Sequence, residues 1–124
     1  MGKRILVVED QEDNRRILRD LLTSVGYEII EAVTGEEGVA MAETGHPDLI
    51  LMDIQLPGID GYEATRRVRA HPALRQVPII AVTSYALSGD DVKAMEAGCT
   101  DYVPKPFSPR ALLAKIREHL PQAV

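Results

Sequence analysis

Three uninterrupted runs of apolar residues stand out along the chain, and each one ends in polar side chains. They are residues 5–8, 49–52 and 78–82, which are followed by Glu9 and Asp10, by Asp53, and by Thr83. Apolar runs of this length are typical of strands that are buried on both faces in the middle of a parallel sheet. Residues 28–32 and 101–103 are short or interleaved with polar side chains, which is typical of strands at the edges of a sheet.

Helical periodicity fills the segments between the strands. The first helix is predicted from residue 13 to the turn at Gly26, and its apolar face is formed by Ile17, Leu18, Leu21, Leu22 and Val25. Further helices are predicted at residues 35–45, 61–70, 89–97 and from 109 onward, three of them after the capping residues Thr34, Asp60 and Ser108. The helix over residues 89–97 has the thinnest apolar stripe, Val92 and Met95, and is expected to be the least firmly packed.

Five strands that alternate with five helices predict an α/β fold, a doubly wound parallel sheet with right-handed crossovers and helices on both faces. The most apolar strands belong inside the sheet, which favours the flavodoxin-like strand order 2-1-3-4-5. The 124 residues are enough for a single domain over residues 1–124 and too few for a second folded module. Any output is therefore expected to act through the surface of this domain.

Composition narrows the classes of function. The net charge of −5 disfavours a general binder of nucleic acid or of anionic membranes, because both would repel the protein. Cys99 is the only cysteine, so neither an intramolecular disulfide nor a cysteine-rich zinc site is expected. No apolar stretch is long enough to span a membrane or to act as a signal peptide. We therefore expect a cytoplasmic protein.

The predicted strand order brings charged side chains together. Glu9, Asp10 and Asp53 follow the two strands that flank the switch point of the sheet, so they should meet in one crevice beside Thr83 and Lys105. At ~4 Å and an effective dielectric of about 20, each pair of carboxylates costs about 4 kcal/mol. A cation is therefore expected, and Mg²⁺ suits carboxylate ligands that also face a phosphate. An aspartate in such surroundings is equipped to attack a phosphoryl group, which would convert Asp53 into an acyl phosphate.

Four motifs, taken in order, are similar to the receiver domains of two-component response regulators, and the resemblance covers essentially the whole chain. They are Val8-Glu9-Asp10, residues 52–61 around Asp53, Thr83 at a strand end, and residues 101–107 around Lys105. The detailed sequence of these motifs resembles that of stand-alone cell-cycle receivers and of receivers in hybrid histidine kinases. Gln11 and Ser84 depart from the residues that are commoner at these positions in the family.

The resemblance implies a role for each matching residue. The metal ligands would be Glu9, Asp10, Asp53 and the main-chain carbonyl of Gln55. Asp53 would be the phosphoacceptor, and Lys105, followed by a cis bond to Pro106, would contact the phosphate. Thr83 and Tyr102 would form a switch pair. The implied partners are a histidine kinase or histidine phosphotransfer protein and a downstream protein target, and the implied activity is self-catalysed phosphotransfer with slow autodephosphorylation.

Other interpretations remain open from the residues alone. Asp53 fits a turn, Glu9 and Asp10 fit the start of a helix, and Tyr102 fits a packed aromatic residue. A phosphatase or phosphomutase with Asp53 as nucleophile is disfavoured, because Gln55 stands where a second acid is expected. A flavin binder is also disfavoured, because the acidic residues 9–13 would repel a flavin phosphate.

Other charged side chains are assigned to the surface. His46, His71 and His119 are predicted to be solvated, because no paired ligands lie near them in the sequence. Arg66, Arg67 and Arg69 are predicted to form a solvated helix face rather than a nucleic-acid site. In the family the first helix commonly docks the phosphodonor, so Arg15, Arg16 and Arg19 are candidates for that contact.

Overall fold

A computed structural model describes residues 2–83 and 90–120. One parallel sheet has the order β2-β1-β3-β4-β5, as predicted. The strands are β1 (Arg4–Val8), β2 (Glu28–Ala32), β3 (Leu49–Asp53), β4 (Ile79–Thr83) and β5 (Asp101–Pro104). The helices are α1 (Glu12–Ser24), α2 (Gly35–Gly45), α3 (Gly61–Arg69), α4 (Asp90–Ala97) and α5 (Pro109–His119), with a short 3-10 helix at Pro72–Leu74.

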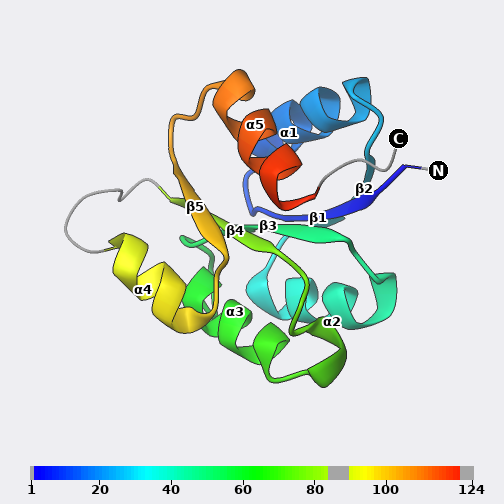
Figure 1. The fold of residues 1–124 in the computed structure, drawn as a ribbon. Coiled ribbons are helices and arrows are strands. Elements are labelled where there is room, and N and C mark those ends of the chain that lie inside the picture. Colours follow the sequence, from blue (N-terminus) through cyan, green and yellow to red (C-terminus); the bar gives the residue numbers. More distant parts are fainter. Residues whose placement is uncertain (1, 84–89, 121–124) are drawn as a thin grey trace.

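The helices form two layers, with α1 and α5 on one face of the sheet and α2, α3 and α4 on the other (Figure 1). Successive residues of the central strands point to opposite layers, as strand geometry requires. In β1, Ile5 and Val7 join the core beneath α1 and α5, while Leu6 and Val8 join the core above α2 and α3. Both faces of β1, β3 and β4 are thereby buried, which explains their unbroken apolar sequences.

The predicted helix boundaries are largely confirmed. The side chains of Thr34, Asp60 and Ser108 each accept a hydrogen bond from a backbone N–H in the first turn of α2, α3 and α5. Gly26 has a φ of 95°, a left-handed conformation that suits the end of a helix. The predicted start of α4 at Gly89 lies outside the described residues. The three N-caps follow β2, β3 and β5, so these helices begin on the side of the sheet where the strands end.

Two parts of the predicted apolar pattern are wrong in detail. The helical periodicity places Ile17 on the packed face of α1, but it is 54% exposed. On α4, Val92 and Met95 are 55% and 50% exposed, and the packed residues are Ala94 and Ala97. Periodicity correctly identified the helices, but it does not tell where the neighbouring element stops covering them.

In the described ranges, no helix has both the length and the apolar character needed to cross a membrane.

Candidate functional site

The carboxyl ends of β1 and β3 bring the three predicted acids together. One carboxylate oxygen from each of Glu9, Asp10 and Asp53 lies within 4.8 Å of the other two. Glu9 and Asp53 are only 2% and 3% exposed, whereas Asp10 is half-buried at the rim. Side chains this deeply buried cannot share their charge with water, so the charges must be matched within the site.

Lys105, which directly follows the edge strand β5, supplies a matching charge. Its ammonium Nζ lies 3.1 Å from Glu9 Oε1 and 3.1 Å from Asp53 Oδ2. The Lys105 backbone N–H donates to the Thr83 carbonyl at 2.7 Å, and the peptide bond to Pro106 is cis. The predicted convergence of Glu9, Asp53 and Lys105 is therefore confirmed by the geometry.

The remaining oxygens of the acids are held by the loops that follow the strands. The Gln55 N–H donates to Asp53 Oδ1 at 3.0 Å, and the Gln11 N–H donates to Glu9 Oε2 at 3.0 Å. Gln11 also donates from its side-chain amide to Asp10 Oδ2 at 3.2 Å. Each acid is thus oriented by a group two residues away or less. Gln11, a departure from the family pattern, has a structural task here, whereas Ser84 lies outside the described residues.

The electrostatics of the site favour an added cation. Burial raises the pKa of Glu9, and the neighbouring charge of Asp53 raises it further. Burial alone would lower the pKa of Lys105, but attraction to Asp53 and Glu9 outweighs this effect and raises it. Three carboxylates face one ammonium, so the site is net negative when all are ionised. Closely spaced carboxylate oxygens in such a site fit a hard divalent cation.

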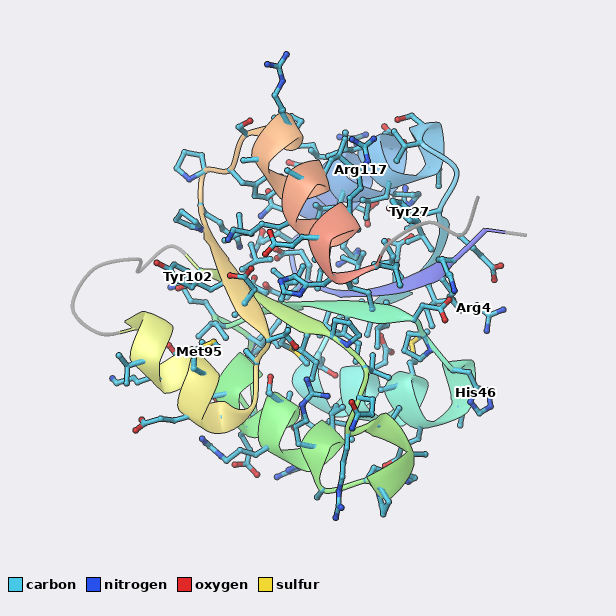
Figure 2. The ribbon with its side chains drawn as sticks, viewed as in Figure 1. Arg4, Tyr27, His46, Met95, Tyr102 and Arg117 are labelled. Atoms are coloured by element: carbon cyan, nitrogen blue, oxygen red, sulfur yellow. The ribbon has the colours of Figure 1, made fainter. Side chains whose placement is uncertain are left out.

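The two predicted switch residues lie on neighbouring strands. Thr83 is 2% exposed at the end of β4, one residue beyond Val82, which is paired with Asp53. Tyr102 is half-buried on β5 and packs against the core cluster that includes Ala94 of α4. Figure 2 shows Tyr102 at the outer side of β5, toward α4. The two side chains therefore lie along the path from Asp53 to α4.

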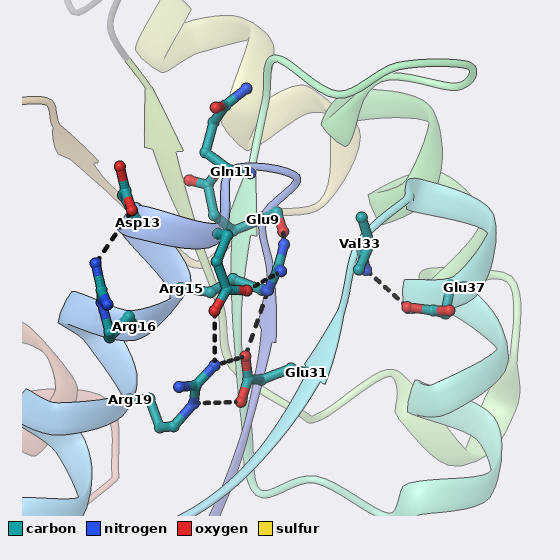
Figure 3. Close-up of polar contacts among 10 residues, drawn as sticks. Glu9, Gln11, Asp13, Arg15, Arg16, Arg19, Glu31, Val33 and Glu37 are labelled. Carbon is teal, nitrogen blue, oxygen red and sulfur yellow. Dashed lines mark hydrogen bonds and ion pairs between the residues drawn. The ribbon is translucent and has the colours of Figure 1, made fainter.

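The arginines of α1 are engaged within the protein, which the sequence did not reveal. Arg19 makes two hydrogen bonds to the Glu31 carboxylate, at 2.7 and 2.9 Å, and Arg16 pairs with Asp13 at 3.2 Å. Arg15 donates to the main-chain carbonyl of Glu9 at 2.9 Å (Figure 3). Asp13 and Arg16 are three residues apart on one helix, a spacing that by itself allows them to pair. The contacts that reach β2 depend on tertiary structure.

His119 is also placed differently from the prediction. Its ring Nε2 lies 2.9 Å from Asp101 Oδ2, and its side chain is 19% exposed, so it is not a solvated histidine. Lys115 contacts the other oxygen of Asp101 at 3.1 Å. The contact was missed because Asp101 lies on β5 and His119 lies at the end of α5, where sequence spacing carries no information about their distance.

A groove of about 530 Å³ opens beside the acids, between α1 and the loop that follows β5. It is lined by Glu9, Asn14, Ile17, Leu18, Lys105, Pro106, Phe107 and Pro109. The exposed Ile17 therefore belongs to an apolar surface that borders the buried carboxylates.

This fold and this site define a class of protein. The chain belongs to the response regulator receiver domain family, whose model matches residues 5–117. Receiver domains are the signalling phosphoacceptors of two-component systems, so a phosphoacceptor role follows from membership of the family.

Individual relatives agree with this assignment. The polar-differentiation response regulator DivK of Brucella ovis is 42% identical over 123 residues, which cover 99% of this chain and 100% of the relative. The receiver domain of a sensor histidine kinase from Pseudomonas aeruginosa, solved with a magnesium ion coordinated in its active site cleft, is 40% identical. It has a TM-score of 0.91 and covers 98% of this chain and 100% of its own. Vibrio cholerae chemotaxis protein CheY4 is 28% identical with a TM-score of 0.92, covering 97% of this chain and 100% of its own.

Proposed function

We propose that this single receiver domain accepts a phosphoryl group on Asp53 from a phosphohistidine and releases it slowly by hydrolysis. The observation that carries the proposal is the position of Asp53, which is buried at the end of a central strand with its Oδ2 3.1 Å from Lys105 Nζ. A carboxylate in this position is a nucleophile with a charged group already beside it.

The transfer is a displacement at phosphorus. An oxygen of Asp53 forms a bond to phosphorus, the bond from phosphorus to the donor's imidazole nitrogen breaks, and that nitrogen keeps the electron pair. Lys105 lies where it would contact the phosphoryl oxygens, and the Gln55 N–H holds the carboxylate in one orientation. The Thr83 hydroxyl would contact the phosphoryl group once it is attached, and Tyr102 would follow the movement of Thr83.

A Mg²⁺ ion fits the residues at the site. Glu9, Asp10 and Asp53 would hold it through their clustered carboxylate oxygens, and the main-chain carbonyl of Gln55 is proposed as a further ligand. When bound, the ion supplies positive charge to the oxygens of the transferring phosphoryl group. The magnesium ion in the Pseudomonas receiver supports this assignment, because that domain shares the fold at 40% identity.

A turnover phosphatase is not favoured. Gln55 occupies the position where such an enzyme would supply a second acid, and Gln55 is exposed rather than part of the buried cluster. The activity proposed for this chain is therefore self-catalysed phosphotransfer and slow autodephosphorylation.

The groove between α1 and the loop after β5 is the proposed docking surface for a histidine kinase or a histidine phosphotransfer protein. It presents Ile17 and Phe107 beside Glu9 and Lys105, the two residues of the site that line it, while Arg16 and Arg19 are occupied by ion pairs. An apolar contact through Ile17 therefore replaces the arginine contact expected from the sequence. The proposed output is the binding of a downstream protein target near α4. The proposed location is the cytoplasm, where such a phosphodonor is supplied.

Acetyl phosphate with Mg²⁺ followed by intact mass measurement tests the proposal. One hydroxylamine-labile phosphate is expected on the wild type, and none is expected on Asp53→Asn. A labile adduct of similar yield on Asp53→Asn would show that Asp53 is not the acceptor. Steady release of phosphate from several phosphate esters would instead indicate an enzyme.

A further inference from the structure

Arg15 makes a contact that none of the other arginines of α1 is seen to make. Its Nη1 donates to the main-chain carbonyl of Glu9 at 2.9 Å, so it binds the backbone between the two adjacent acids. Its other nitrogens pair with Glu12, one turn earlier on α1, and with Glu31 on β2 at 3.4 Å. Figure 3 shows the Arg15 guanidinium between Glu9 and Glu31. Only 12% of the side chain is exposed.

The partners of Arg15 are themselves fixed. Glu31 accepts two hydrogen bonds from Arg19, and these bonds hold the pKa of Glu31 below its ordinary value, so Glu31 stays charged. Glu31 also belongs to β2, whose Ala32 carbonyl accepts the Glu9 N–H at 3.0 Å. The Glu9 peptide is thus held from β2 on one side and from Arg15 on the other.

This arrangement opposes a specific electrostatic force. Glu9 and Asp10 are neighbours in the chain and both point carboxylates at the same site, so their repulsion, together with that of Asp53, favours a backbone change that separates them. A charge-assisted hydrogen bond to the Glu9 carbonyl resists that change. Arg15 and Arg19 are balanced by Glu12 and Glu31, so the anchor adds little net positive charge that would repel a cation.

We propose that Arg15 is a positioning residue, which holds the Glu9–Gln11 backbone so that the carboxylates of Glu9 and Asp10 stay close enough to share one divalent cation. This inference rests on the proposed function, since it concerns the same metal site. Groups that orient metal ligands typically change metal affinity 10–100-fold when they are mutated.

The test compares three variants. Arg15→Gln removes both the charge and the anchor, and Arg15→Lys keeps the charge but cannot span the Glu9 carbonyl, Glu12 and Glu31 together. Arg16→Gln is the matched control, because Arg16 is the next residue on α1, its side chain is 62% exposed, and it pairs with Asp13 rather than Glu9. Circular dichroism and thermal melting without Mg²⁺ establish that each variant is folded.

Calorimetric titration with Mg²⁺ is the first readout. We expect Arg15→Gln and Arg15→Lys to bind Mg²⁺ about 10-fold more weakly than the wild type, and Arg16→Gln to bind within about 2-fold of it. In phosphorylation by acetyl phosphate, the Arg15 variants should need about 10-fold more Mg²⁺ for half-maximal rate and should recover the wild-type rate at saturating Mg²⁺. A lower plateau at saturating Mg²⁺ would point to a general structural defect and overturn the positioning role.

Amide hydrogen exchange without Mg²⁺ gives a readout that does not depend on the ion. The Gln11 N–H, which donates to Glu9 Oε2, should exchange faster in both Arg15 variants than in Arg16→Gln. If the wild type binds Mg²⁺ and the Arg15 variants bind it as tightly as Arg16→Gln does, the positioning role of Arg15 is wrong, while the proposed metal site stands. Absence of Mg²⁺ binding by the wild type would defeat the proposed metal site and this inference with it.

Discussion

The Lys105 ammonium lies 3.1 Å from Asp53 Oδ2 and 3.1 Å from Glu9 Oε1, so one cation bridges two buried carboxylates that come from different strands. The charges of Glu9 and Asp53 are tolerated in the apoprotein largely because of this bridge. Besides the phosphoryl contact proposed for it, Lys105 is therefore expected to stabilise the folded site before any ligand binds.

Removal of the ammonium is expected to destabilise the protein. Lys105→Gln should lower the free energy of unfolding by about 3 kcal/mol without Mg²⁺, because two buried carboxylates lose their counter-charge. Urea unfolding measures this change. The double variant Lys105→Gln, Asp53→Asn should have a higher free energy of unfolding than the two single changes predict when added, because one of the repelling carboxylates is then neutral. Strict additivity would mean that the bridge does not couple the two residues.

Magnesium is expected to stabilise the fold through the same acids. At about ten times its dissociation constant, Mg²⁺ should add about 1.4 kcal/mol to the free energy of unfolding, which raises the melting temperature by roughly 5 °C. Thermal melting in MgCl₂ and in KCl of the same ionic strength measures the shift. Persistence of the shift in the double variant Asp10→Asn, Asp53→Asn would place the ion elsewhere.

The sequence predicted those parts of the protein that depend on local chemistry. Unbroken apolar runs identified the central strands, and the polar residues at their ends identified Glu9, Asp53 and Lys105 as a cluster, because parallel strands place their carboxyl ends on one edge. What the sequence could not predict depends on which surfaces meet. Ile17 has the spacing of a buried residue, yet it is exposed and lines the groove beside Lys105. Arg15 and Glu31 are joined only by the packing of α1 against β2.

Tyr27 offers a test of packing without a change in charge. It is 4% exposed, and its hydroxyl is the only buried side-chain oxygen or nitrogen of the described residues without a hydrogen-bond partner. Tyr27→Phe should therefore raise the free energy of unfolding by about 1 kcal/mol, because a buried hydroxyl without a partner is unfavourable. Tyr27→Ala should lower it by about 3 kcal/mol, because the ring itself fills space in the core. Destabilisation by Tyr27→Phe would mean that the hydroxyl has a partner, such as a bound water.

Asp101 is predicted to make stability depend on acid pH. Burial alone would raise the pKa of Asp101, but hydrogen bonds from His119, the Tyr102 N–H and Lys115 hold it below its ordinary value. A carboxyl whose pKa is lower in the folded state contributes its full stabilisation above the unfolded pKa of about 4. That contribution is lost as the pH falls through the lower, folded value.

The stability difference between the wild type and Asp101→Asn should thus be constant between about pH 5.5 and pH 5 and should shrink below about pH 4. Urea unfolding at several pH values measures it, with Asp20→Asn on the exposed side of α1 as the control. A difference that grows on acidification would contradict the predicted role of Asp101 as a charged acceptor.

The movement of α4 on phosphorylation is predicted to pivot at its C-terminal end. Arg69 of α3 is not solvated as predicted with Arg66 and Arg67, because its guanidinium donates to the Gly98 carbonyl at 2.8 Å and to Thr100 Oγ1 at 3.3 Å. These bonds tie the segment after α4 to α3. The body of α4 is held mainly by the small residues Ala94 and Ala97, so it has little packing to resist a shift. A few kcal/mol of contact between a phosphoryl group and Thr83 is then enough to favour a second position of α4.

Amide hydrogen exchange with Mg²⁺, before and after addition of beryllium fluoride as a substitute for the phosphoryl group, measures this movement. Protection should change across Asp90–Ala97 and at Tyr102, whereas residues 98–100 should keep theirs, because Arg69 holds them in both states. Arg69→Gln should extend the change to residues 98–100, while Arg66→Gln, which loses only an exposed pair with Glu63, should behave as the wild type. If protection changes only in the loops around Asp10 and Asp53, phosphorylation does not reach α4 and the output must lie on another surface.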